Sequence, residues 1–169
     1  FGAYSLVIGR RSQAVEVLRQ AYQLDPASPV IASVYMWLMA RNGQIQEAIE
    51  VAERAAEQYP DNARVLMSLA TTYERAGLHD EELAVCERLG AAEGDKVTAS
   101  MFKAVALAHL GRLDEARLLA EETLSGADSQ VLERVILEVY RTTSLRNAPR
   151  LSDLRRVLLE AGQGNVLDF

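Results

Sequence analysis

The chain contains one cysteine, Cys86, and two histidines, His79 and His109. A single cysteine cannot form an intramolecular disulfide, and so few sulfur and imidazole groups do not supply the ligands of a structural zinc site. We therefore expect no disulfide framework, no metal and no cofactor. The compartment stays open, with a reducing, cytoplasmic location favoured.

Long apolar runs are also missing. The densest stretch, from Val30 to Ala40, is interrupted by Ser33 and followed by Arg41, well short of the roughly 18 consecutive apolar residues of a spanning helix. We expect no membrane insertion. Four prolines and ten glycines in 169 residues exclude low-complexity and collagen-like chains. The chain starts at Phe1 without a basic leader segment, and we expect it to be part of a longer protein.

Lysine is scarce as well. The basic residues are sixteen arginines and two lysines, against 24 acidic residues, and the net charge is −6. Residues 43–130 carry −9, while the segments before and after carry +2 and +1. An acidic middle repels phosphate backbones, so we expect no nucleic acid partner. The preference for arginine is typical of a GC-rich genome and says nothing about mechanism.

Four glycines stand at a fixed interval. Gly9, Gly43, Gly77 and Gly111 follow one another in steps of 34 residues. Other columns keep the same step: Ala14, Ala48 and Ala116 form one, and Pro26 and Pro60 form another. A repeat of this period indicates an array of similar stacked units.

Each 34-residue unit is predicted to form two antiparallel helices. The glycine ends the first helix, where a residue in the left-handed conformation is needed, and proline follows the second helix. The small residues of the second helix allow close packing. In the second unit the apolar residues form two stripes at helical spacing: Ala32, Tyr35, Met36 and Met39, then Ala48, Ile49, Ala52, Ala55 and Ala56.

This pattern resembles the tetratricopeptide repeat family. The resemblance extends over residues 1 to about 130 and rests on the glycine column together with Tyr73, Ala55 and Pro60. It implies an all-α fold, a right-handed superhelical array of antiparallel helix hairpins with about four repeats. The repeats are expected at residues 1–28, where the first is truncated, and at 29–62, 63–96 and 97–130. Residues 131–169 are expected to form a degenerate terminal helical hairpin and a tail.

Several residues depart from the family's pattern. Glu82 occupies the column of small residues that holds Ala48, and Lys103 occupies a column that is usually leucine. Gly94 and Asp128 stand where proline is usual. We therefore expect looser packing in the third and fourth repeats, with a shifted second helix in the third.

No group of residues indicates catalysis. Neither histidine has a cysteine or a carboxylate at the spacing of a metal site, so each is interpreted as an exposed or packing residue. Cys86 shares a column with Ala52 and Ala120, which indicates a small buried residue. The acidic run from Asp80 to Glu82 favours the positive end of a helix dipole. We expect no enzymatic activity.

The resemblance also implies where a partner binds. In that family the first helices of the repeats line a concave face. The columns that line it hold here Ser33, Trp37, Arg41, Met67, Thr71, Arg75, Met101, Val105 and His109, and the row continues with Val135 and Val139. The apolar middle of this face favours an amphipathic helix or an apolar peptide, and its arginines favour acidic groups on the partner. The alternatives are packing between repeats, or a groove filled by a flanking segment of the same protein.

The leading hypothesis is therefore a protein–protein interaction scaffold that binds a partner peptide or amphipathic helix on its concave face. The alternative is a regulatory or self-assembling arm of a larger bacterial transcription regulator or secretion protein, with the groove occupied internally. Self-assembly would make the chain a homo-oligomer.

Overall fold

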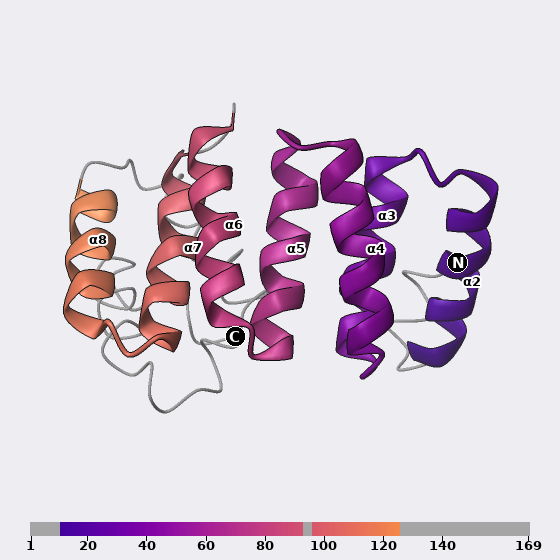
Figure 1. The fold of residues 1–169 in the computed structure, drawn as a ribbon, viewed down its shortest axis with the longest axis horizontal. Coiled ribbons are helices and arrows are strands. Elements are labelled where there is room, and N and C mark those ends of the chain that lie inside the picture. Colours follow the sequence, from indigo (N-terminus) through magenta and orange to yellow (C-terminus); the bar gives the residue numbers. More distant parts are fainter. Residues whose placement is uncertain (1–10, 93–95, 126–169) are drawn as a thin grey trace. The chain divides into compact units, whose positions relative to one another are not determined.

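The computed structural model describes residues 11–92 and 96–125. These residues form seven helices and no strand (Figure 1), which confirms the prediction of an all-α fold. The helices are α2 (Arg11–Leu24), α3 (Pro29–Arg41), α4 (Ile45–Gln58), α5 (Ala63–Ala76), α6 (His79–Ala91), α7 (Lys96–His109) and α8 (Leu113–Ser125). Within the described ranges, no helix combines the length and the apolar character needed to cross a membrane.

Some of the sequence predictions fall outside the described residues. These are residues 1–10 of the truncated first repeat, the terminal hairpin and tail at 131–169, and the single positions Gly94, Asp128, Val135 and Val139.

The helices keep the 34-residue step of the sequence. α4, α6 and α8 begin at Ile45, His79 and Leu113, which are 34 residues apart. The expected shift of α6, the second helix of the third repeat, is therefore wrong for its starting position. The start of the helix is set by the turn before it, which the glycine column keeps in register.

The chain divides into two compact units, Phe1–Leu78 and His79–Phe169. In the first unit α2 packs against α3, and α3 packs against both α4 and α5, which also contact each other. In the second unit α7 packs against both α6 and α8. Each unit thus builds its core from helices that are close together in the sequence.

Glycine lies in the turns after α3, α5 and α7. Gly43, Gly77 and Gly111 have φ angles of 86°, 76° and 79°, a left-handed conformation that glycine adopts without the steric penalty of a Cβ atom. In each turn the residue after the glycine donates its N–H to the carbonyl five residues earlier, which satisfies an acceptor at the helix end. These bonds join Gln44 N to Met39 O at 3.0 Å, Leu78 N to Tyr73 O at 3.0 Å and Arg112 N to Leu107 O at 2.9 Å. The predicted role of the glycine column is confirmed at these three positions.

Polar side chains define the starts of α3 and α5. Ser28 Oγ accepts a hydrogen bond from Ile31 N at 3.3 Å, and Asn62 Oδ1 accepts one from Val65 N at 3.2 Å. Each cap satisfies an N–H group that has no partner inside its own helix. The two caps are 34 residues apart, so the repeat also fixes where these first helices begin.

Small and flexible apolar side chains build the cores. Both stripes predicted for the second repeat are buried, which confirms that prediction, and Cys86 is buried as expected. Ala14, Ala48 and Ala116 are also buried. Because the distance between packed helices depends on the side chains at the contact, this column of single methyl groups allows close packing.

The helices of the second unit are buried to different extents. In α7 six consecutive residues, from Ala104 to His109, are buried, so this helix is covered around its circumference. In α8 the buried residues are Ala116, Ala120 and Leu124, one per turn, whereas Leu118 is 57% exposed. Among the described helices of this unit, α7 is therefore the central one, and α8 has one packed side and one open side.

Candidate functional site

The nine residues predicted to line a concave face are divided between the two units. Six of them lie on α3 and α5 of the first unit. The other three, Met101, Val105 and His109, lie on α7 of the second unit. They therefore form two sets. One set lies on α3 and α5 and the other on α7, and each of these is the first helix of its repeat.

Trp37 and Arg41 are one helical turn apart on α3. The guanidinium carbon of Arg41 lies 4.9 Å from the centre of the Trp37 ring, which is a cation–π contact. Both side chains are partly exposed, and Trp37 also packs against the core of the first unit. The Nε1 atom of Trp37 is enclosed and has no hydrogen-bond partner among the described residues. The Trp37 ring therefore connects the core to the surface.

Four further residues of the predicted face lie on the same two helices. On α5, Met67 and Arg75 are partly exposed. The Nε atom of Arg75 is enclosed and lacks a hydrogen-bond partner in the part of the chain that the structure describes. Ser33 and Thr71 are buried, and their hydroxyl groups donate to backbone carbonyls of their own helices at 2.7 Å and 3.0 Å. The surface of this set is thus formed by Trp37, Arg41, Met67 and Arg75.

Met101, Val105 and His109 are buried along α7. Their burial fits the alternative in which such side chains pack inside the array. Their role in binding a partner stays a prediction.

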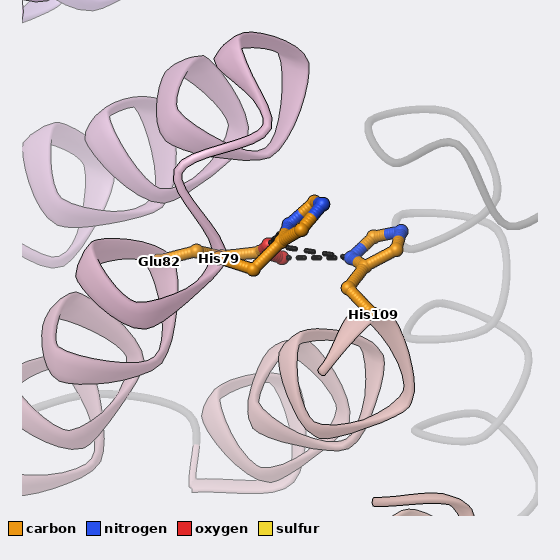
Figure 2. A network of polar contacts seen from close by, with 3 residues as sticks. All are labelled: His79, Glu82 and His109. Carbon is orange, nitrogen blue, oxygen red and sulfur yellow. Dashed lines mark hydrogen bonds and ion pairs between the residues drawn. The ribbon is translucent and has the colours of Figure 1, made fainter. Parts of the chain in front are cut away.

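The second unit brings together His79, Glu82 and His109, although Glu82 and His109 are 27 residues apart in the sequence. His79 and Glu82 lie in the first turn of α6, and His109 is the last residue of α7 (Figure 2). Glu82 Oε2 lies 2.9 Å from His79 Nδ1 and 3.2 Å from His109 Nδ1. The two imidazole rings stack, with centroids 4.5 Å apart and planes inclined by 18°. Both histidines therefore direct Nδ1 toward one carboxylate.

The prediction that neither histidine has a carboxylate at the spacing of a metal site is wrong. One signal was in the sequence: His79 and Glu82 are three residues apart, which places them on one face of a helix. A second was the departure of Glu82 from its alanine column. The pairing with His109, 27 residues from Glu82, depends on the packing of α6 against α7, which residue spacing does not encode.

Comparisons with known proteins agree with the repeat. A family model described as tetratricopeptide repeat matches residues 9–71 and 39–95, and a second model with the same description matches residues 91–130. The comparison with curated proteins returned no match.

Several solved structures are similar to this chain. MamA AMB-1 is 24% identical, with a TM-score of 0.62 over 96% of each chain. MamA MSR-1 is 23% identical, with a TM-score of 0.59 over 92% of this chain and 91% of that one. TTC0263, a thermophilic TPR protein in Thermus thermophilus, is 16% identical, with a TM-score of 0.65 over 95% of this chain and 94% of that one. At these identities the similarity concerns the fold.

Proposed function

Because the chain belongs to the tetratricopeptide repeat family, we propose that it is a scaffold for protein–protein interaction whose partner binds along α3 and α5. In this proposal the partner segment is a peptide or an amphipathic helix that carries apolar side chains and acidic groups. The chain binds this segment and performs no chemistry of its own.

The observation that carries the proposal is the surface formed by Trp37, Arg41, Met67 and Arg75. It combines an aromatic ring, a thioether and two guanidinium groups, all partly exposed, on two helices that pack against each other. Tryptophan and arginine contribute most of the binding free energy at many interfaces, and methionine adapts its shape to a partner. Guanidinium groups bind carboxylates through two parallel hydrogen bonds. This composition suits an apolar segment with acidic groups.

Two enclosed hydrogen-bond donors on the same surface also favour the binding of a partner there. The Nε1 atom of Trp37 and the Nε atom of Arg75 lack hydrogen-bond partners among the described residues. A buried polar group without a partner costs about 1–3 kcal/mol. Both side chains are partly exposed, and in this proposal they rotate on binding so that either donor reaches an oxygen of the bound segment. Binding would then remove an energetic penalty of the unbound chain.

The proposed site is narrower than the predicted concave face. Met101 and Val105 are fully buried, and in this proposal they pack the second unit and contact no partner. Ser33 and Thr71 also contact no partner in this proposal, because they are buried in the first unit and their hydroxyl groups bond within their own helices.

Affinity capture from a cell lysate, read by mass spectrometry, tests this proposal. Arg75→Glu places a negative charge on the proposed surface. Arg54→Glu makes the same change at an exposed position of α4, on the second helix of the repeat. We expect a partner that wild type and Arg54→Glu retain and that Arg75→Glu loses. Trp37→Phe keeps an aromatic ring and removes the Nε1 donor, so it should retain less of the same partner.

Circular dichroism of each variant checks that the helices are intact. Equal retention by all variants, or no captured protein, would contradict the proposed site. A concentration-dependent mass in light scattering that Arg75→Glu abolishes and Arg54→Glu preserves would instead support the self-assembling arm.

A further inference from the structure

Three side chains of the second unit replace the residues that the repeat carries elsewhere. The replacements put imidazole and carboxylate groups where other repeats hold apolar, small or guanidinium side chains. His79 stands in the column of Ile45 and Leu113, Glu82 in that of Ala14, Ala48 and Ala116, and His109 in that of Arg41 and Arg75. The packing of α6 against α7 brings all three into one cluster. The three replaced side chains are therefore neighbours in the folded chain.

The cluster offers ligand atoms at short mutual distances. One ring nitrogen of each histidine and one carboxylate oxygen of Glu82 all lie within 4.8 Å of one another. Figure 2 shows Nδ1 of both rings directed at the carboxylate, one from the start of α6 and one from the end of α7. Nitrogen and oxygen atoms that converge from two helices are the arrangement that a metal ion needs.

The cluster is almost enclosed. The side chains of His109 and Glu82 are 1% and 4% exposed, and that of His79 is 19% exposed. Desolvation disfavours the ionised form of a carboxylate in such surroundings, and hydrogen bonds or a positive charge close by offset this cost. A metal ion held between the three groups supplies this charge. The exposed edge of His79 provides a path for the ion.

We propose that His79, Glu82 and His109 bind Zn²⁺ through Nδ1 of both histidines and Oε2 of the glutamate. Bonds of about 2.0–2.2 Å place the ligands of a tetrahedral zinc ion roughly 3.3–3.6 Å apart. The Nδ1–Oε2 distances of 2.9 Å and 3.2 Å reach this range with shifts of a few tenths of an ångström. The two rings, which are stacked with planes inclined by 18°, rotate on binding so that both Nδ1 lone pairs point at the ion. A water molecule fills the fourth position, as in other zinc sites with two histidines and one glutamate.

The ligand set selects among divalent ions. Imidazole nitrogen suits Zn²⁺, whereas Mg²⁺ and Ca²⁺ prefer oxygen ligands. The bound ion connects the start of α6 to the end of α7, so it stabilises the pairing of these two helices within the second unit.

Isothermal titration calorimetry of the whole chain with zinc chloride tests this site, with magnesium chloride as the comparison. We expect one Zn²⁺ per chain and no heat from Mg²⁺. Glu82→Ala and His79→Leu restore residues that the repeat carries at these columns, so both variants are expected to fold. Each should weaken zinc binding by more than about 100-fold, beyond the range for the loss of an outer-shell partner.

Asp80→Ala and Glu81→Ala are the matched controls. They remove exposed carboxylates from the same first turn of α6 and should keep the wild-type affinity, while circular dichroism confirms the helix content of all four variants. Three results would overturn the proposal: no zinc binding by the wild type, unchanged affinity in Glu82→Ala and His79→Leu, or an equal loss of affinity in the two controls.

Discussion

Replacing Gly111 by alanine is expected to destabilise the protein by about 1 kcal/mol, even though the turn has room for the added methyl group. A Cβ atom at this position would meet no heavy atom within 4 Å, so no clash contributes. The penalty comes from the backbone, since a φ of 79° costs an L-residue about 1–2 kcal/mol. The reduced freedom of the unfolded chain offsets about 0.4–1 kcal/mol of this.

Gly90 provides the opposite case in the same unit. It is the second-to-last residue of α6, and a Cβ atom there would also meet nothing within 4 Å. Because its backbone is helical, alanine should stabilise the folded state by up to about 0.5–1 kcal/mol, the range for a helix interior. The same substitution in equally open surroundings thus has opposite signs at Gly111 and Gly90.

Urea denaturation followed by far-ultraviolet circular dichroism measures both changes. In thermal unfolding, a change of 1 kcal/mol corresponds to a midpoint shift of about 2–4 °C for a chain of this length. Gly111→Asn is the control, because asparagine tolerates the left-handed conformation better than alanine and should lose less stability. The reasoning is refuted if Gly111→Ala is more stable than the wild type, or if Gly90→Ala is destabilised.

Three further predictions concern the core, a helix cap and an exposed ion pair. Met36 is fully buried, and Met36→Ala should lower the free energy of unfolding by about 2–5 kcal/mol in the same urea assay; a loss below about 1 kcal/mol would contradict its burial. Asn62→Ala removes the acceptor for Val65 N and should cost about 1 kcal/mol, whereas no change would show that the cap contributes nothing. The hydrogen bond from Arg112 lowers the pKa of Glu115 in the folded chain. The stabilisation by this pair is therefore complete above the ordinary glutamate pKa, and it is lost as the pH falls through the lowered pKa of the folded chain. An NMR titration should show the pKa of Glu115 returning toward its ordinary value in Arg112→Ala, and an unchanged pKa would rule out this cause.

The helix ends could be predicted from the sequence because their causes are local. Gly43, Gly77 and Gly111 each adopt the left-handed conformation that the turn requires, whatever packs around it. The buried stripes of α3 and α4 could be predicted for a similar reason, since the helical period alone decides which side chains share a face.

The exposure of the side chains on the predicted binding face cannot be derived from the helical period alone. Met67 and Met101 occupy the same column, yet Met67 is partly exposed and Met101 is fully buried. The period assigns each side chain to a face of its helix, but what covers that face is set by packing. His109 shows the same limit, because its contact with Glu82 joins residues 27 positions apart through the packing of α6 against α7.

Because α7 is buried and α8 is partly exposed, the two helices should tolerate substitutions to different degrees. Every side chain between Ala104 and His109 is enclosed, so the amides of this segment should exchange hydrogen slowly and substitutions there should rarely be neutral. The side of α8 that carries Leu118 packs against little, and substitutions there should mostly be tolerated. A spectroscopic probe attached at Leu118 would therefore report on the second unit without disturbing its core.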